Sequence, residues 1–318
     1  MRPVAILAAT LALATPSGAD GQDQFGRAVS IGEDGAIYVA KPGPSRGPAG
    51  VFVYRAGTDG SWDLTSTLQL PGAAESGHSL SPSVASAGNL LLIGAGDPDA
   101  VQGAYAFQYG QGEWTDMGPL PFRSAPPAPA TGAVDFAGIL RILQPPPRMV
   151  VVDGPLAAIS GPAEGAGNAQ MVRVYRMDGS GWAPDGEIRQ PEGNRDPAFG
   201  SALAVANGAI VVGSPGHGQG VVYRFSRQGS AWAADGQLSV EPQTTDSTAT
   251  PEQFGAALSV GDGRMLVGAP GASNRAGAAY LFDLSSPSDD PLPFRPWTDD
   301  EGQGFGAAVA LRGSSASI

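Results

Sequence analysis

One sequence motif occurs six times along the chain and constrains the fold more than any other feature of the sequence. Each copy has a two-residue opening, a short apolar run, a two-residue turn and, in the first five copies, a second apolar run that ends in small residues. The openings are 55, 65, 54, 55 and 51 residues apart, at Phe25-Gly26, Leu80-Ser81, Pro145-Pro146, Phe199-Gly200, Phe254-Gly255 and Phe305-Gly306. Recurrence at this period indicates stacked supersecondary units, none of which buries its apolar face alone.

The first copy predicts four short strands. Residues 27–32 place Val29 and Ile31 on one face with a period of two. Asp34-Gly35 then predicts a type I′ hairpin turn, which needs positive φ at both central residues. A second strand is predicted over residues 36–40, before Pro42, which has no N–H for the strand ladder. Residues 51–54 and 62–70 predict the third and fourth strands.

The other copies carry the same signals at the same offsets. The turn signal returns at Gly88-Asn89, Asp153-Gly154, Asn207-Gly208 and Asp262-Gly263. The small-residue stops are Ala40-Lys41-Pro42, Gly94-Ala95-Gly96, Ser160-Gly161-Pro162, Gly213-Ser214-Pro215 and Gly268-Ala269-Pro270. Paired aromatic residues mark the third strand at Tyr105/Phe107, Tyr223/Phe225 and Tyr280/Phe282. A tryptophan precedes the fourth strand at Trp62, Trp114, Trp182 and Trp232, whereas Trp297 lies too close to the sixth opening to belong to this series.

Four strands per unit predict an all-β fold, a β-propeller of four-stranded blades with five complete repeats and a partial sixth. A β-sandwich does not repeat a sequence motif at this period, and one coil of a β-helix is much shorter than the repeat found here. The sixth copy is predicted to stop after one strand, at residues 307–312, which either pairs with the first blade or begins an unfinished sixth one. Residues 20–318 are predicted to form a single domain. A Pro-rich insertion around 119–147 accounts for the long step of 65 residues, unless that stretch is a loose linker.

The first residues have the layout of a secretory signal peptide. Met1-Arg2 precedes an apolar stretch over 4–14, and small residues at 17–19 predict cleavage near Ala19, which makes 1–19 the leader. The apolar stretch is too short to span a bilayer, so no membrane span is predicted in the mature chain. The chain has no cysteine, and an exported protein without disulfides suits a bacterial periplasm or the cell exterior. A formal charge of −12 argues against nucleic acid as a partner.

On its openings, its Gly/Ala-Pro stops and its tryptophan-led fourth strand, the chain resembles the FG-GAP repeat family, which includes the propeller of integrin α subunits. The resemblance is strongest over 199–225 and 254–282. It implies a propeller used for binding or adhesion, in which some blades often hold calcium through DxDxDG loops. Those loops are absent here, because the corresponding turns hold Asp34, Asp153 and Asp262 with at most one acidic neighbour. A calcium ion in a protein is coordinated by six to eight oxygen atoms. No cofactor is therefore expected, and Asp97-Pro98-Asp99 is the only weak calcium candidate.

The sequence shows no recognisable catalytic set, so no catalytic, cofactor-binding or metal residue is assigned. Ser45 lies in a G-x-S-x-G motif, which can form a nucleophile elbow. Such an elbow needs a strand-to-helix turn, but Ser45 lies in a Pro-rich loop. His78 and His217 lie in loops without metal or triad spacing, and Lys41, the only lysine, is followed by proline where a phosphate-binding loop needs Ser or Thr. Residues 58–62 and 177–182 loosely resemble the Asp-box turns of sialidases, which also need an arginine cluster and a tyrosine nucleophile.

The predicted function is that of an exported, non-catalytic binding or adhesion module. Its partner would be a protein or a surface polysaccharide, held by loops at one rim of the ring. The alternatives are a sialidase-like glycoside hydrolase and a structural component of an extracellular matrix.

Overall fold

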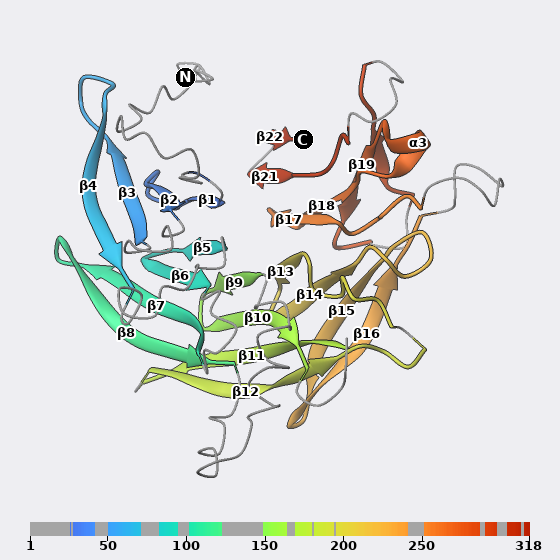
Figure 1. Ribbon diagram of the computed structural model, residues 1–318, viewed down its shortest axis with the longest axis horizontal. Helices are drawn as coiled ribbons and strands as arrows, with labels where there is room; N and C mark the ends of the chain where they lie inside the picture. The colour runs from blue at the N-terminus through green and yellow to red at the C-terminus, as the bar shows by residue number, and fades with distance from the viewer. Residues whose placement is uncertain are drawn as a thin grey trace, which may run out of the picture.

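Five antiparallel sheets of four strands are arranged as the blades of a β-propeller (Figure 1). The computed structural model describes Gly26 and residues 28–41, 50–70, 83–94, 102–122, 149–163, 169–179, 181–193, 195–240, 251–286, 290–297, 304–312 and 315–318. Within each blade the strands follow one another in chain order, from the innermost to the outermost. The predicted fold class is confirmed.

The strand bounds follow the repeat closely. Blade 1 contains β1 (Ala28–Ile31), β2 (Ile37–Lys41), β3 (Gly50–Ala56) and β4 (Trp62–Gln69). Blade 2 contains β5 (Val84–Ala87), β6 (Leu90–Gly94), β7 (Gln102–Gly110) and β8 (Glu113–Pro121). Blade 3 contains β9 (Val150–Asp153), β10 (Leu156–Pro162), β11 (Gln170–Asp178) and β12 (Gly181–Arg189). Blade 4 contains β13 (Leu203–Ala206), β14 (Ala209–Ser214), β15 (Val221–Gln228) and β16 (Ala231–Leu238). Blade 5 contains β17 (Ala257–Gly261), β18 (Arg264–Ala269), β19 (Ala278–Asp283) and the short β20 (Leu292–Phe294), with the four-residue α3 (Ala272–Arg275) between β18 and β19.

The inner hairpin turns differ from one blade to the next. Asn207-Gly208 and Asp262-Gly263 have positive φ at both residues, as the predicted type I′ turn requires. In blade 3 the turn lies one residue later, at Gly154-Pro155, and it is not type I′, because proline cannot take a positive φ and only the glycine does. In blade 1 the type I′ prediction is wrong. There the turn is longer, since Ile31 pairs with Ile37, and the Asp34 carboxylate accepts the N–H of Ala36 at 3.1 Å.

The core lies between the blades. The buried side chains form four clusters, and each cluster combines residues of two consecutive blades. The aromatic pair of the third strand contributes to these clusters. In blade 4 the Phe199 ring lies 6.3 Å, centroid to centroid, from both Tyr223 and Phe225. A single four-stranded sheet would leave one such face uncovered, so each blade depends on its neighbour for stability.

The glycines of the repeated openings and stops bring consecutive blades into backbone contact. The Gly255 N–H donates to the carbonyl oxygen of Gly268 at 3.0 Å, so that opening and stop of one unit are joined. A Cβ placed on Gly213, the stop glycine of the preceding unit, would overlap the carbonyl oxygen of Gly255. A Cβ on Gly268 would overlap the carbonyl oxygen of Gly306 in the same way. The two glycines therefore allow main chains of adjacent units to approach more closely than any side chain permits.

In blades 1 to 4 the predicted tryptophan is the first or second residue of the fourth strand. Trp62, Trp114, Trp182 and Trp232 are paired across the hairpin with Ala56, Tyr109, Met177 and Arg227. Three residues after the tryptophan the fourth strand carries one unpaired residue, a β-bulge that the sequence did not indicate. The bulge residue is Asp185 in blade 3 and Asp235 in blade 4, and a glycine follows each of them.

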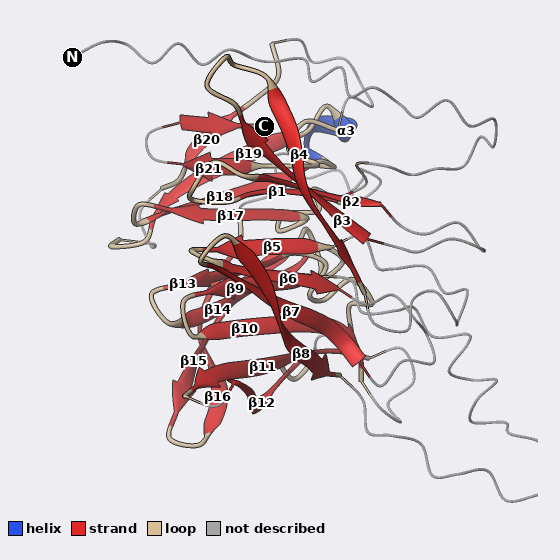
Figure 2. Ribbon diagram, turned by 90° about the vertical axis from the view of Figure 1, so that its left-hand side faces the viewer, coloured by secondary structure: helices blue, strands red, loops and turns tan. Residues whose placement is uncertain are grey.

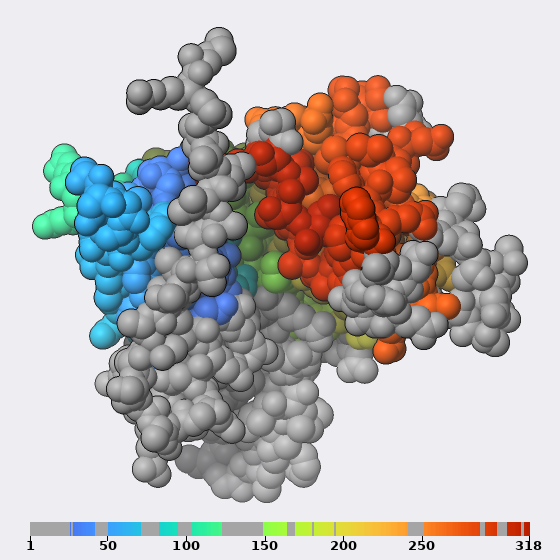
Figure 3. Space-filling view, turned by 90° about the horizontal axis from the view of Figure 1, so that it is seen from above, coloured from blue at the N-terminus to red at the C-terminus, as the bar shows by residue number. Residues whose placement is uncertain are grey.

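A two-stranded hairpin occupies the sixth position of the ring. It consists of β21 (Ala310–Arg312) and β22 (Ser315–Ser317), and β21 packs against β17 of blade 5. The Leu311 N–H donates to the Ser259 hydroxyl at 2.9 Å, and the Arg312 guanidinium reaches the Glu33 carbonyl at 3.3 Å. In Figure 3 the red C-terminal segment accordingly lies between the blue first blade and the orange fifth blade. The predicted single strand over 307–312 is wrong in extent, and among the described residues β21 pairs with β22 and not with a strand of blade 1.

Several predictions fall on segments outside the described residues. These are the leader 1–19, the loops with Ser45, His78 and Asp97-Pro98-Asp99, and most of the insertion around 119–147. Residues 119–121 of that insertion continue β8, and the Phe122 side chain is buried. Within the described part of the chain, no helix has the length and apolarity needed to cross a membrane.

Candidate functional site

The antiparallel meander of each blade sends its turns to two opposite faces of the ring. The inner strands of consecutive blades pack side by side, so the turns that follow them all lie on one face. We call this face the turn face and define it by the inner turns at residues 32–36, 88–89, 154–155, 207–208 and 262–263. In Figure 2 the described hairpin turns gather along the left edge of the stacked sheets. The opposite face carries the openings and stops that the structure describes in full, those at 199–200, 213–215, 254–255 and 268–270.

The turn face carries mainly carboxylates and amides. The residue types that favour tight turns are also those with short polar side chains. As a result, every inner turn contains or directly follows an exposed carboxylate or amide, and six such residues lie there, namely Glu33, Asp34, Asn89, Asp153, Asn207 and Asp262. The sequence identified five of them as part of a turn signal, but only the fold brings the turns of separate blades together.

A cavity of about 430 Å³ opens on this face between blades 1, 2 and 3. We call it the turn-face cavity. Its polar lining comes from the turns of three blades and from β7, and consists of Glu33, Asn89, Gln108 and Asp153. Leu90, Pro155 and Met177 supply its apolar part. Such a lining can accept hydrogen bonds through its carboxylates and both donate and accept them through its amides. None of the residues that line it is cationic.

Asp34 stays ionised beside this cavity. Partial burial would raise the pKa of its carboxyl, but hydrogen bonds from the Ala36 N–H and from Arg55, with the charge of that arginine, hold the pKa below its ordinary value. The Arg55 Nη1 atom lies 2.6 Å from Asp34 Oδ2, and the guanidinium carbon lies 4.7 Å from the centroid of the Tyr109 ring in blade 2. Arg55 thus neutralises one carboxylate at the blade 1–blade 2 junction and leaves Glu33 and Asp153 to set the charge of the cavity.

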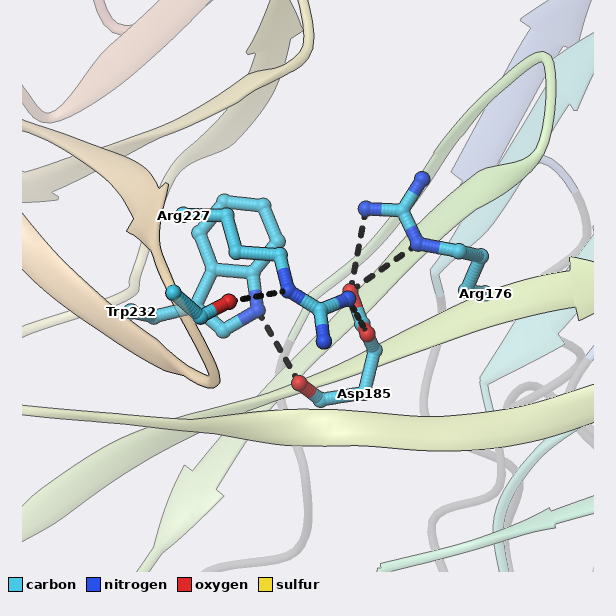
Figure 4. A network of polar contacts seen from close by, with 5 residues as sticks. Arg176, Asp185, Arg227 and Trp232 are labelled. Atoms are coloured by element: carbon cyan, nitrogen blue, oxygen red, sulfur yellow. Dashed lines mark hydrogen bonds and ion pairs between the residues drawn. The ribbon is translucent and has the colours of Figure 1, made fainter.

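A second polar cluster joins blades 3 and 4 (Figure 4). The Asp185 side chain is only 7% exposed and lies between two guanidinium groups, those of Arg176 in its own blade and Arg227 in the next. Arg176 donates to Asp185 Oδ2 from two nitrogens, at 3.0 and 3.2 Å, and the indole N–H of Trp232 donates to the Asp185 main-chain carbonyl at 3.2 Å. Asp185 therefore satisfies the two arginines and ties the outer hairpins of two blades together.

The turns that resemble Asp boxes have a local explanation. Asp59 Oδ1 accepts hydrogen bonds from the Ser61 N–H at 2.9 Å and from the Ser61 hydroxyl at 2.6 Å. Both bonds lower the pKa of the Asp59 carboxyl, and Asp283 makes the same pair of bonds with Ser285. These aspartates shape the turn between the third and fourth strands.

On the opposite face, His217 lies in a loop that a buried aspartate holds in place. Asp196, which is 3% exposed, accepts hydrogen bonds from the Ser214 hydroxyl at 2.8 Å, the Gly216 N–H at 2.9 Å and the Ala198 N–H at 2.7 Å. The sequence reasoning missed Asp196. Its signal was an acidic residue shortly before an opening, which Glu252 repeats before Phe254-Gly255. We assign Asp196 a structural role, because the bonds from Ser214 and Gly216 connect the segment before the opening of blade 4 to its stop loop, and the bond from Ala198 holds that segment in a turn.

Metal-ligating side chains do not gather in the described residues. No group of three or more Asp, Glu or His side chains lies close enough there to hold a metal ion. Lys41 ends β2 with a half-buried side chain.

Comparisons with known proteins give no family for the chain. No protein-family model matches it, and no curated protein does. Solved structures do match. One of them is the crystal structure of a protein from Lactobacillus plantarum, a structural-genomics target, with a TM-score of 0.47, 12% sequence identity and coverage of 87% of this chain and 67% of that one.

Proposed function

We propose that the chain is an exported, non-catalytic binding module of the FG-GAP type, and that the turn-face cavity holds its ligand. The observation that carries this proposal is a cavity built by three separate blades, whose lining combines carboxylates and amides with apolar side chains. Ligand sites in propellers lie where the loops of several blades converge. The repeated openings and stops support the family, and the layout of residues 1–19 supports export.

The chemistry of the cavity favours a polysaccharide without negative charge. Carboxylates accept the hydroxyl protons of sugars in charge-assisted hydrogen bonds, and amides can both donate and accept. Asp153 and Glu33 would repel an anionic ligand, as would the net charge of −12. We therefore expect a neutral or cationic glycan and not a sialylated or uronate-rich one.

The sialidase-like alternative receives less support from the same residues. A sialidase holds the substrate carboxylate with arginines, but Arg176 and Arg227 already share the carboxylate of Asp185. The turn-face cavity has no arginine in its lining.

The proposal can be tested with immobilised polysaccharides of three kinds, namely a neutral glucan, cationic chitosan and anionic alginate. We expect the purified protein to be retained by the first or the second and not by alginate. Asp153→Asn should weaken retention, whereas Asp262→Asn, an equivalent change on the turn face outside the cavity, should leave it unchanged. Retention on alginate alone, or equal losses in the two variants, would contradict the proposal. Amino-terminal sequencing of the exported protein, with Ala19 absent, would support the leader.

A further inference from the structure

The bulge aspartates of blades 3 and 4, Asp185 and Asp235, occupy the same place in the repeat, but their carboxylates differ in partners. Each aspartate is the unpaired residue of its fourth strand. Asp185 uses both carboxylate oxygens. Its Oδ2 atom accepts two hydrogen bonds from Arg176 of its own blade, at 3.0 and 3.2 Å, and its Oδ1 atom accepts one from Arg227 of the next blade.

The Asp235 carboxylate has only the partner from its own blade. Its Oδ2 atom lies 2.5 Å from the Nη1 atom of Arg224. Within the described part of the chain no group donates to its Oδ1 atom, the oxygen that in Asp185 accepts the Arg227 guanidinium. Asp235 therefore lacks the cation that the following blade supplies to Asp185.

At the junction of blades 3 and 4, this cation is accompanied by an aromatic ring. Arg227 and Trp232 are paired across the outer hairpin of blade 4, and both reach Asp185 (Figure 4). The indole N–H donates to the Asp185 main-chain carbonyl at 3.2 Å, while the guanidinium pairs with the carboxylate. A Cβ placed on Gly186 would lie 2.9 Å from the Trp232 ring, so the ring sits directly on this glycine.

Blade 5 supplies neither the cation nor the ring. The phenylalanines of β15 and β19 lie at matching positions, since each pairs with the second residue of the second strand, namely Phe225 with Ile210 and Phe282 with Met265. Two residues later, Leu284 therefore matches Arg227. In addition, β20 pairs only as far as Leu281, so no residue of β20 lies opposite Leu284 in the place of Trp232.

A cavity of about 460 Å³ lies at this place, between blades 4 and 5. We call it the blade 4–5 cavity. Asp235, Gly236 and Arg224 form part of its lining, and a Cβ on Gly236 would meet nothing closer than the Arg224 Cβ at 3.8 Å. Its apolar wall consists of Val211, Val222, Leu238, Met265 and Leu284. The volume falls within the range of about 300 to 1,000 Å³ that is usual for small-molecule sites.

We propose that the blade 4–5 cavity binds a small indolylalkylamine, that is, an indole ring joined by a short alkyl chain to a protonated amine. The ring lies over Gly236 against the apolar wall and donates its N–H to the Asp235 main-chain carbonyl, as Trp232 does one blade earlier. The ammonium group pairs with Asp235 Oδ1, in the place of the Arg227 guanidinium. The net charge of −12 favours this cation over an anionic indole. The site is separate from the turn-face cavity, so the inference does not depend on the proposed function.

The first experiment titrates the purified protein with tryptamine by isothermal calorimetry. We expect a dissociation constant on the order of 1 mM or lower, because part of the gain from burying the ring is offset by the cost of association. N-acetyltryptamine keeps the ring but has no charge, and it should bind at least about fivefold more weakly, since a hydrogen bond to a charged group is the stronger kind. Undetectable binding of tryptamine would overturn the proposal, and so would equal affinities for the two compounds.

The second experiment removes the carboxylate that receives the amine. Asp235→Asn should weaken tryptamine binding at least about fivefold and leave the affinity for N-acetyltryptamine within about twofold of the wild type, because only the first ligand carries the charge. The retained affinity for N-acetyltryptamine also shows that the cavity is intact. Asp262→Asn is the matched control, since Asp262 does not line this cavity, and it should change neither affinity. Equal losses for both ligands in Asp235→Asn, or no loss for tryptamine, would contradict the assignment.

Two further variants fill the cavity from opposite walls. Gly236→Leu adds a side chain on the blade 4 wall, where a Cβ fits without overlap, and Leu284→Trp adds a ring on the half-buried blade 5 wall. Each should weaken the binding of both compounds at least about tenfold, because a close-packed junction leaves no room for the ligand. The second variant keeps the test valid if the first does not fold. Gly110→Leu, at an exposed glycine of β7 whose Cβ would meet nothing within 4 Å, should bind as the wild type does. Unchanged affinity in a folded cavity variant would place the ligand elsewhere and refute the proposal.

Discussion

Removing the Trp232 side chain should destabilise the ring more than removing an exposed tryptophan side chain. The side chain is 7% exposed, covers Gly186 of the preceding blade and donates its N–H to the Asp185 carbonyl. Trp232→Ala leaves a void between blades 3 and 4, because the strand pairs on both sides keep the two sheets in place. Trp297→Ala is the matched control, since Trp297 is fully exposed.

The magnitude follows from the contacts that are lost. Truncating a buried tryptophan to alanine typically costs about 3 to 5 kcal/mol of unfolding free energy. The hydrogen bond of the indole accounts for about 1 kcal/mol of this, and Trp232→Phe, which keeps a ring but loses the N–H, should cost about 1 to 2 kcal/mol. For a chain of this size one kcal/mol corresponds to about 2 °C in Tm, so Trp232→Ala should melt about 6 to 10 °C lower.

Thermal unfolding followed by circular dichroism measures these shifts, with urea unfolding as a second probe. Trp297→Ala should stay within about 1 °C of the wild-type Tm, because surface substitutions usually cost little. Equal shifts for Trp232→Ala and Trp297→Ala would refute the reasoning. So would a shift below about 2 °C for Trp232→Ala, because the blades would then not depend on the side chains packed between them.

Three further predictions concern other contacts. Gly213→Ala should cost about 2 kcal/mol or more, because its Cβ overlaps the Gly255 carbonyl, whereas Gly110→Ala should be nearly neutral; urea unfolding of both variants checks this. Asp185→Ala should cost about 2 to 3 kcal/mol by removing the acceptor of two guanidinium groups, and Asp185→Asn should cost less; equal costs in urea unfolding would contradict this. Arg55→Ala should raise the pKa of Asp34 toward its ordinary value of 3.8, as carboxyl NMR titration would show. Because the pKa of Asp34 is lowered in the folded protein, its small contribution to stability is present above the unfolded pKa and is lost as the pH falls through the folded pKa. An unchanged titration would mean that Arg55 does not act on Asp34.

The fold could be predicted because its signals are local and repeated. Alternating apolar residues, glycine-containing turns and proline stops recur in nearly the same order in each unit, so that a clear copy such as 199–225 helps to interpret a weak one. The exact turn type was less predictable, because it depends on single neighbours. Pro155 moves the turn of blade 3 by one residue, and Asp34 bonds to Ala36 in a longer turn than Asp-Gly usually forms.

The candidate sites were much less predictable, because they arise between units. The sequence identified Asp153 and Asn89 as turn formers, but their common cavity requires three blades side by side. The ion pair between Asp185 and Arg227 carried no local signal, since the two residues are 42 positions apart and lie in consecutive blades.

The glycine contact between the units has a consequence for how such a ring can grow. The carbonyl oxygen of a stop glycine accepts the N–H of the opening glycine in its own unit. The same stop glycine also lies against the carbonyl oxygen of the opening glycine in the next unit, so each junction combines groups from two units. An inserted unit that ran from one opening to the residue before the next would recreate two complete junctions without altering its neighbours. A duplication that was not a whole number of units long would misplace the glycines and set a side chain against a carbonyl. The number of repeats in such a ring could therefore change only by whole units, whatever substitutions occurred among the side chains on the two faces.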